Sequence, residues 1–325
     1  MSESVLRIRD LRVTFNTQMG ELKAVRGIDV DVAPGEILGV VGESGSGKSV
    51  SFLAAMGLLP SSATITGSVK LDGQELIGSK RKAFRSVRGK SLAMVFQDPL
   101  SALNPVHRVG DQIVEMIQSH QDMNTHDAEK KAVELLEIVG IPQPDERALQ
   151  YPHEFSGGMR QRVVIAMAIA NNPKVLIADE PTTALDVTVQ AQILEVIQRV
   201  QQTFGTAVVL ITHDLGVIAR VADSVNVMYA GRNVESGSVQ SIFDHPSHPY
   251  TRGLLSSLPH EGIERLHPIA GFPPNMLAPP SGCGFAPRCQ HAIEACSAEL
   301  PSLSPFEDLL TSCIRADELR VGRRS

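Results

Sequence analysis

The sequence predicts an α/β fold built on a parallel sheet. Three short apolar segments bounded by polar turns are interpreted as buried strands, at residues 36–41, 174–178 and 206–211. Segments with helical spacing of apolar residues are found between them, at 49–56 and 191–200. Strand, helix and strand in this order are typical of a parallel sheet with crossover helices. The 325 residues are enough for one large domain and a smaller one.

The middle of the chain predicts a helical insertion, at about residues 100–155. No strand pattern is found from 106 to 140. Apolar side chains recur at helical spacing over residues 127–139, and Gly140 follows directly. An apolar stripe that ends at a glycine favours an amphipathic helix.

The chain changes character after residue 257, where prolines become frequent and leave little room for regular structure. We therefore expect a domain of residues 1–258 and a C-terminal extension of residues 259–325. All cysteines of the chain lie in this extension, at Cys283, Cys289, Cys296 and Cys313. Clustered cysteines in an intracellular chain favour metal binding or catalysis over disulfides.

Composition excludes several classes of protein. The longest wholly apolar run, residues 163–170, is far shorter than the roughly 20 residues of a membrane-spanning helix. The first ten residues have no apolar core, so no secretory signal is expected. The formal net charge of −6 argues against a nucleic-acid-binding protein, which usually has a basic surface. These features favour a cytosolic protein.

A glycine-rich segment, Gly42-Glu-Ser-Gly-Ser-Gly-Lys-Ser49, matches the complete P-loop pattern between a predicted strand and a predicted helix. Its glycines allow backbone N–H groups to surround phosphates, Lys48 reaches the β- and γ-phosphates, and the Ser49 hydroxyl binds Mg²⁺. The alternative is a flexible surface loop, which the complete pattern and its context disfavour. The expected nucleotide-binding residues are Gly42, Glu43, Ser44, Gly45, Ser46, Gly47, Lys48, Ser49 and Val50.

A carboxylate pair follows another predicted strand. Asp179 and Glu180 come directly after the apolar run 175–178. In such a position Asp179 enters the Mg²⁺ shell, and Glu180 polarises the water that attacks the γ-phosphate. By itself, an Asp-Glu pair is more often a solvated strand end. Together with the P-loop it predicts nucleotide hydrolysis.

Four further motifs identify a family. The segment Tyr151-Pro-His-Glu-Phe-Ser-Gly-Gly-Met-Arg-Gln-Arg162 resembles the signature of ATP-binding-cassette (ABC) ATPases. Gln97 resembles the Q-loop glutamine, residues 184–186 the D-loop, and His213 the switch histidine of that family. The resemblance covers about residues 1–258. It implies a P-loop NTPase cassette with a RecA-like core and a helical subdomain, which binds and hydrolyses ATP with Mg²⁺.

In that family one cassette does not complete its own site, because the signature faces the nucleotide of the opposite subunit. The resemblance therefore assigns Ser156, Gly157, Gly158 and Met159, with Asp186 of the D-loop, to the ATP of a partner. It also assigns Gln97 to the Mg²⁺ shell and, with Glu180 and His213, to catalysis. Phe15 lies where the family places an aromatic residue that stacks on adenine; the alternative is a core residue of an N-terminal strand.

Finer features resemble the dipeptide/oligopeptide importers within this family. They are the segments 97–105 and 248–255, together with Met159 where most ABC signatures have glutamine. The resemblance implies an ATPase subunit for peptide import, at the cytoplasmic face of the membrane. Its partners are a second, homologous ATPase subunit in a heterodimer, two membrane permeases and an extracytoplasmic substrate-binding protein. The same subfamily also serves nickel, metallophores, heme and glutathione, so the cargo stays open.

A soluble ABC ATPase acting on nucleic acid is the remote alternative. Repair members insert a long coiled coil between P-loop and signature, but Lys48 and Ser156 are only 108 residues apart here. Translation members carry two cassettes, and this chain has one. We interpret the basic run 80–82 with its neighbouring arginines as a solvated face. No nucleic-acid partner is expected.

The cysteine spacing of the extension leaves three interpretations open. Four thiolates bind either an iron–sulfur cluster or Zn²⁺, or they stay unligated. No pair is two to four residues apart, as structural zinc sites favour. The pattern in residues 282–289 resembles the importer subfamily, some members of which hold a [4Fe-4S] cluster, and this implies a structural cluster here. His245, His248, His260 and His267 are interpreted as loop residues because their spacing is irregular.

Overall fold

The computed structural model describes residues 4–79, 81–183, 185–257 and 269–319. Some of the positions discussed above lie outside the described residues: Lys80, Ala184, His260, His267 and the expected boundary near residue 258.

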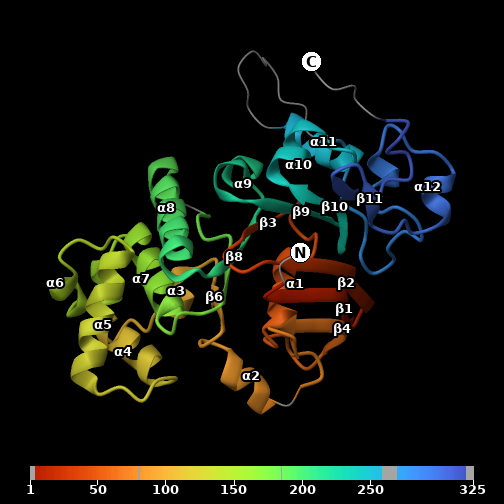
Figure 1. Ribbon diagram of the computed structural model, residues 1–325. Coiled ribbons are helices and arrows are strands. Elements are labelled where there is room, and N and C mark those ends of the chain that lie inside the picture. Colours follow the sequence, from red (N-terminus) through yellow and green to blue (C-terminus); the bar gives the residue numbers. More distant parts are fainter. Residues whose placement is uncertain (1–3, 80, 184, 258–268, 320–325) are drawn as a thin grey trace. The chain divides into compact units, whose positions relative to one another are not determined.

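The contacts divide the chain into two compact units, drawn together in Figure 1. Unit 1 combines residues 79–211 with two short N-terminal segments, 1–5 and 32–37. Unit 2 contains residues 6–31, 38–78 and 212–325. The predicted division of the chain into 1–258 and 259–325 stays a prediction.

Unit 1 contains three parallel strands in the order β8-β7-β6. Their bounds are β6 Leu92–Val95, β7 Val175–Asp179 and β8 Ala207–Thr212. All residues of the three strands are buried, as expected for parallel strands that are covered on both faces. Two of these strands, β7 and β8, were predicted from the sequence within one residue at each end.

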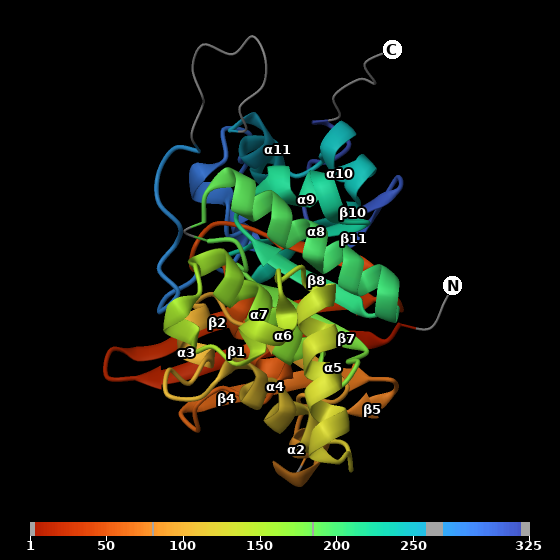
Figure 2. The same cartoon turned by 90° about the vertical axis from the view of Figure 1, so that its left-hand side faces the viewer.

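The helices of unit 1 include the expected insertion. Figure 2 shows α4 and α5 next to α7. The helix predicted at residues 127–139 is α5, which begins where the Asn124 side chain accepts a hydrogen bond from the Asp127 N–H. Its buried side chains follow the predicted stripe. The helices are α2 Arg81–Val87, α3 Pro99–Ala102, α4 Val109–Gln118, α5 Thr125–Ile138, α6 Pro144–Ala148, η1 Pro152–Glu154, α7 Gly157–Ile169 and α8 Val187–Phe204.

Unit 2 contains a mixed group of strands in the order β11-β12-β10-β9-β3. Strand β3 (Ile37–Val41) pairs in parallel with β9 (Ser224–Tyr229), and β9 pairs antiparallel with β10 (Arg232–Ser238). The helices α9, α10 and α11 of this unit lie near β9 and β10 in Figure 1. Their bounds are α9 Leu215–Val221, α10 Val239–Asp244 and α11 Pro249–Ser256.

A second, antiparallel sheet of unit 2 has the order β2-β1-β4-β5. The long strand β1 alternates buried and exposed residues, because one face of this sheet packs on the core and the other faces solvent. Helix α1 follows β3 in the sequence, and its first residue is the P-loop lysine, Lys48. The bounds are β1 Leu6–Thr17, β2 Gly20–Val32, β4 Ala63–Leu71, β5 Gln74–Glu75 and α1 Lys48–Ala55.

The described part of the C-terminal extension has only short regular elements, in agreement with its many prolines. Strand β12 (Leu309–Thr311) pairs with β10, with Thr311 opposite Glu235, and β11 (Ser304–Phe306) adds to β12. Leu309 and Thr311 alternate with an exposed residue, so a three-residue strand buries two side chains. Two short helical turns, η2 Ala286–Arg288 and α12 Ala295–Ala298, complete this part.

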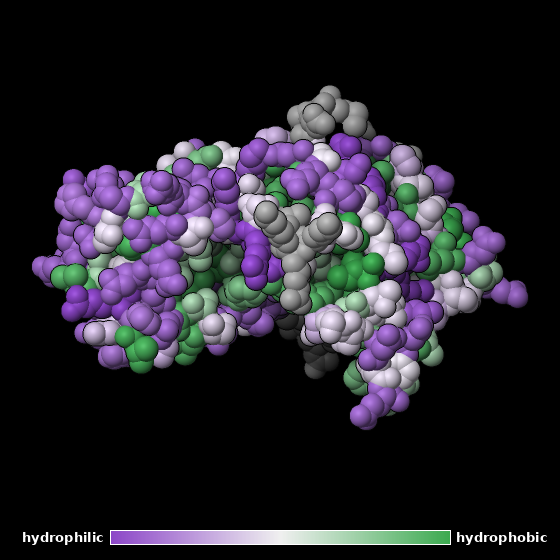
Figure 3. All heavy atoms as spheres, turned by 90° about the horizontal axis from the view of Figure 1, so that it is seen from below, coloured by the Kyte–Doolittle hydropathy of each residue, from purple (hydrophilic) through white to green (hydrophobic). Residues whose placement is uncertain are grey.

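One face of the molecule is mainly hydrophilic. On the face shown in Figure 3, hydrophilic residues cover most of the surface and hydrophobic residues form smaller areas between them. Within the residues that the structure describes, no helix has the length and apolar character needed to cross a membrane.

Candidate functional site

The P-loop of unit 2 connects β3 to α1 and wraps around its own lysine. Lys48 is buried, and its ammonium group donates hydrogen bonds to the carbonyl oxygens of Gly42 at 2.7 Å and Glu43 at 3.2 Å. The tip, Ser44 and Gly45, is exposed. The loop therefore encloses a buried cation, and a cation beside a glycine-rich turn at a helix start suits an anionic phosphate.

Gly42 shows why the loop requires glycine. Its φ is +153°, and a Cβ atom added there would lie 2.1 Å from the carbonyl oxygen of Met228. That oxygen belongs to the backbone of β9, which does not move as a side chain does. The loop is held further by the Gly231 N–H, which donates to the Ser46 carbonyl at 3.0 Å. The neighbouring strand β9 and its turn thus support the P-loop directly.

Gln97 and Glu180 lie together in unit 1. The Glu180 carboxylate accepts hydrogen bonds from the Gln97 amide at 3.3 Å and from the Thr183 hydroxyl at 2.8 Å. Glu180 has φ +46°, a conformation that non-glycine residues rarely adopt and that is found at functional sites. Asp179, one residue earlier, ends β7 and is 8% exposed. Unit 1 therefore places two carboxylates and an amide at the end of one strand pair.

The signature and the D-loop also meet in unit 1. Ser156 begins α7, and its hydroxyl accepts a hydrogen bond from the Met159 N–H at 3.4 Å. Asp186 begins α8, and its carboxylate accepts two backbone hydrogen bonds at 3.0 Å each. A Cβ atom added at Gly158 would lie 2.5 Å from Val189 Cγ1 of α8. Gly158 of the signature is thus needed for the close approach of these two helix starts.

Phe15 and His213 belong to unit 2. Phe15 lies near the end of β1, opposite Ala63 of β4, and is half-buried. His213 follows β8 directly and is exposed, and Asp214 behind it caps α9 by accepting hydrogen bonds from Gly216 and Val217. Stacking of Phe15 on adenine stays a prediction, as does the role of His213.

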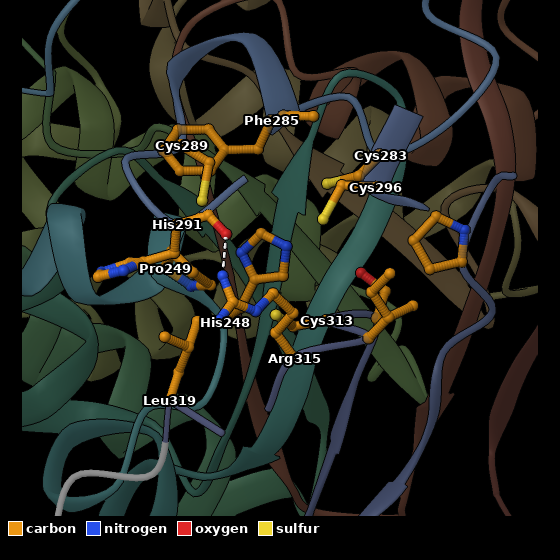
Figure 4. Close-up of a pocket in the computed structure, with 14 residues that line it drawn as sticks. His248, Pro249, Cys283, Phe285, Cys289, His291, Cys296, Cys313, Arg315 and Leu319 are labelled. Carbon is orange, nitrogen blue, oxygen red and sulfur yellow. Dashed lines mark hydrogen bonds between the residues drawn. The ribbon is translucent and has the colours of Figure 1, made fainter. Parts of the chain in front are cut away.

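The four cysteines of the extension line one small pocket in unit 2 (Figure 4). All four are half-buried and none forms a disulfide. Cys283 and Cys296 lie next to each other, because the Cys283 N–H donates to the Cys296 carbonyl at 2.8 Å. Burial raises the pKa of Cys283 and Cys289 and raises that of Cys313 to about 11. These three thiols are therefore protonated at neutral pH as long as nothing coordinates them.

The cysteines do not form a compact site for one ion. Among the described residues, no three His, Cys, Asp or Glu side chains are close enough to hold a single metal ion. A structural zinc site needs four ligands in a close tetrahedron. The described residues thus show no preformed ion site, and the zinc, cluster and unligated interpretations of the cysteines all stay predictions.

His248 differs from the loop residue that its spacing predicted. It is 1% exposed, and its Nδ1 accepts a hydrogen bond from the Tyr250 N–H at 3.1 Å, which caps α11. Burial lowers its pKa to about 3, so it stays neutral. The backbone N–H groups of His248 and Ser247 donate hydrogen bonds to the buried carboxylate of Glu235. Burial raises the pKa of this carboxyl group to about 7. Sequence patterns did not identify Glu235, because an isolated Glu in a strand gives no motif.

Comparisons with known proteins agree with these motifs in both parts of the chain. A family model described as "ABC transporter" matches residues 25–183, and one described as "Oligopeptide/dipeptide transporter, C-terminal region" matches residues 234–296. The oligopeptide transport ATP-binding protein OppD of Bacillus subtilis is 50% identical over 309 residues, which cover 94% of this chain and 86% of that protein. OppD of Escherichia coli is 46% identical over 318 residues, covering 97% and 93%. The dipeptide transport ATP-binding protein DppD of Bacillus subtilis is 50% identical over 303 residues, covering 92% and 90%.

Solved structures show the same fold. The ATP-binding cassette MJ0796, in a dimeric post-hydrolysis state bound to ADP and Pi, matches with a TM-score of 0.64 and 25% identity, over 72% of this chain and 98% of that one. The subunit cbiO1 of Clostridium perfringens matches with a TM-score of 0.63 and 27% identity, over 74% and 91%. Half of the residues are shared with relatives over nearly the full length, and both the cassette and the C-terminal region are matched. The chain therefore belongs to the family of ATP-binding subunits of oligopeptide/dipeptide ABC transporters.

Proposed function

We propose that this chain hydrolyses MgATP to drive the import of dipeptides or oligopeptides through a membrane transporter. The observation that carries the peptide cargo is the match of residues 234–296 to a family model described as the C-terminal region of oligopeptide/dipeptide transporters. The relatives that are about half identical over nearly the full length are named for the same two cargoes. The ATPase itself does not contact the cargo, so the assignment rests on these likenesses.

The residues of the site divide the chemistry between them. The P-loop N–H groups and Lys48 bind the phosphates. Ser49 and Asp179 supply hydroxyl and carboxylate oxygens, which suit Mg²⁺, and this ion neutralises charge on the phosphates when bound. Glu180, held by Gln97 and Thr183, polarises the attacking water. His213 contacts the γ-phosphate.

The second half of each site comes from a partner. The start of α7 carries Ser156 and the N–H groups of Gly157 and Gly158, which face a γ-phosphate bound by the opposite subunit. The dimeric state of the MJ0796 cassette, bound to ADP and Pi, supports this arrangement. Met159 has no side-chain amide, but its N–H already bonds to Ser156. The proposed partner is a second, non-identical ATPase subunit.

The remaining partners are two permeases and an extracytoplasmic substrate-binding protein, with this chain attached to the cytoplasmic face of the membrane. The names of the relatives, which are transport ATP-binding proteins, support a transporter assembly. Closure of the two ATPase subunits around nucleotide then drives transport through the permeases. Hydrolysis of the nucleotide lets the two ATPase subunits separate again.

Uptake assays test the cargo. Cells that lack this chain are complemented with wild type or with Lys48→Ala, and the uptake of labelled dipeptide, oligopeptide, nickel, heme and glutathione is measured. We expect peptide uptake with wild type only. Unchanged peptide uptake with Lys48→Ala, together with loss of one of the other solutes, would overturn the peptide assignment. Membrane fractionation adds a second arm, since the chain should leave the membrane only when the permeases are absent.

The cysteines of the extension form the ligand set of a [4Fe-4S] cluster in this proposal. Four half-buried thiols around one pocket support it, because such clusters are held by four cysteine thiolates at separate irons. Backbone N–H groups of Phe285, Ala286 and Arg315 point at the sulfurs, and hydrogen bonds of this kind stabilise thiolates. The cluster supplies a structural crosslink to an extension that has little core of its own.

Anaerobic purification tests the cluster. We expect absorption at about 400 nm and bound iron in the wild-type protein. Both the absorption and the iron content should be lower in Cys289→Ser. A folded wild-type chain that is colourless and free of iron would overturn the cluster and leave the cysteines unligated.

A further inference from the structure

One side chain of the C-terminal extension contacts the P-loop. Arg288 donates hydrogen bonds from its two terminal nitrogens to the two carboxylate oxygens of Glu43, at 2.6 and 3.0 Å. The two residues are 245 positions apart in the sequence. The Arg288 side chain is only 5% exposed and that of Glu43 is 25% exposed. This pair is thus a shielded, two-point ion pair, the strongest kind of hydrogen-bonded contact between side chains.

The guanidinium is fixed on its other sides as well. It donates to the carbonyl oxygens of Ile269 and Ala270 at 3.2 and 2.9 Å and to the Tyr229 hydroxyl at 3.1 Å. Its carbon lies 5.7 Å from the ring centre of Tyr229 and 5.8 Å from that of Phe285. Contacts of both types favour arginine over lysine. These contacts therefore hold the Arg288 guanidinium rigidly in the position from which it bonds to Glu43.

Glu43 is tied to the rest of the unit at three points. Its side chain meets Arg288, its N–H donates to the Tyr250 hydroxyl at 2.8 Å, and its carbonyl oxygen accepts from the Lys48 ammonium at 3.2 Å. Tyr250 is fully buried against Tyr229, with ring centres 4.5 Å apart. The second residue of the P-loop thus joins the lysine of the loop to the extension.

The charge of Glu43 explains why such a partner is needed. A carboxylate in the P-loop lies close to where a triphosphate of several negative charges binds, and like charges at such distances repel. Arg288 neutralises this carboxylate and turns it away toward the extension. Without Arg288, the Glu43 carboxylate loses its ion-pair partner while it stays partly shielded from water, which is unfavourable.

We propose that Arg288 is a positioning residue for ATP, which acts through Glu43 to neutralise the P-loop and hold it open for the phosphates. This inference rests on the proposed function, in that the P-loop is taken to bind ATP. It makes the C-terminal extension a structural part of the nucleotide site, although none of its residues matches a nucleotide-binding motif.

A set of variants of the full-length chain tests the proposal by displacement of a fluorescent ATP analogue with MgATP. Arg288→Ala lowers MgATP affinity about tenfold, because it leaves Glu43 unpaired. Adding Glu43→Gln to Arg288→Ala restores most of the affinity, since the repelling carboxylate is gone. A role of Arg288 in folding alone would not respond to this second change. In the assembled transporter, Arg288→Ala raises the KM for MgATP more than it lowers kcat.

The control is Arg7→Ala, which removes an exposed arginine–carboxylate pair with Asp31 elsewhere in the same unit. It leaves MgATP affinity unchanged. Should Arg288→Ala fail to fold, Arg288→Lys replaces it; lysine keeps the charge but loses the two-point contact, and an intermediate affinity is expected.

Two results overturn the inference while leaving the proposed function intact. One is a folded Arg288→Ala or Arg288→Lys chain that binds MgATP within twofold of wild type. The other is an affinity loss that Glu43→Gln does not restore. A wild-type chain that binds no MgATP overturns the proposed function, and this inference with it.

Discussion

The Gln97 amide donates a hydrogen bond of 3.3 Å to the Glu180 carboxylate, across 83 residues of sequence. The register of two strands explains the contact. Val95 of β6 is paired with Ala178 of β7 in a parallel ladder, and Gln97 and Glu180 each lie two residues beyond this pair. Parallel strands end at the same edge of a sheet, so both side chains reach the same height. The strand pairing thus delivers the expected base and the expected Q-loop residue to one place.

The first prediction concerns Glu180→Gln. The amide keeps the size of the side chain but cannot accept a proton, so MgATP binding stays near wild type and turnover falls by about 10²- to 10⁴-fold. The assay is ATP hydrolysis by the assembled transporter, in which the catalytic carboxylate of the partner ATPase subunit has already been replaced. Wild-type turnover in that assembly would show that Glu180 is not the base.

The second prediction separates the two sites of the assembly. Ser156→Arg blocks the face that the signature offers to the partner's nucleotide, so hydrolysis at the partner's P-loop is lost. The isolated chain still binds MgATP at its own P-loop with wild-type affinity. Ser156→Ala serves as the control for the helix cap, which contributes about 1 kcal/mol to stability. Reduced MgATP binding by the isolated Ser156→Arg chain would instead place the serine at its own nucleotide.

The third prediction compares neighbouring glycines of the signature. A Cβ at Gly158 would lie 2.5 Å from Val189 Cγ1, and the branched valine in helix α8 has little rotamer freedom. Gly158→Ala should therefore lower the free energy of unfolding by about 1–3 kcal/mol. A Cβ at Gly157 would meet Leu185 at an ordinary 3.7 Å, so Gly157→Ala should change stability little.

Chemical denaturation of the three proteins measures this difference. Val189→Ala in the Gly158→Ala background should recover most of the loss, because it removes the methyl group that the new Cβ meets. Equal destabilisation by the Gly157 and Gly158 variants would mean that the contact with α8 is not the cause.

The sequence predicted the elements of the cassette because their signals are local. The apolar run 174–178 and the stripe 127–139 each indicate one element, and β7 and α5 are found within two residues of them at each end. The described part of the extension has little regular structure, as its prolines predict, but no local pattern marks its two strands. Strand β12 has only three residues, and its pairing with β10 depends on a partner about 75 residues earlier, which no local pattern reveals.

The candidate nucleotide site shows the same limit, in that local sequence patterns do not reveal contacts between distant residues. Separate motifs identified Gln97 and Glu180, and only the family resemblance predicted that both belong to one catalytic site. No motif identified Arg288, whose partner Glu43 lies at the other end of the chain. Arginine pairs with acids on most surfaces, so only its burial and its two-point contact single it out.

The last prediction uses the pKa of Glu235. This residue is buried on β10 beside Ser247 and His248, and burial raises its pKa from 4.5 to about 7. A raised acid pKa means that the folded state binds the proton more tightly, so its stabilising contribution is complete below pH 4.5 and is lost as the pH rises through 7. Glu235→Gln keeps an acceptor for the same two N–H groups and has no such titration.

The unfolding free energy of the variant relative to wild type should therefore increase by about 2 kcal/mol between pH 5 and pH 8. Neutral His248 and nearby Arg252 are common to both proteins, so their own pH effects cancel in this difference. Urea denaturation at several pH values measures it, and a difference that stays constant from pH 5 to pH 8 would show that Glu235 titrates in its ordinary range.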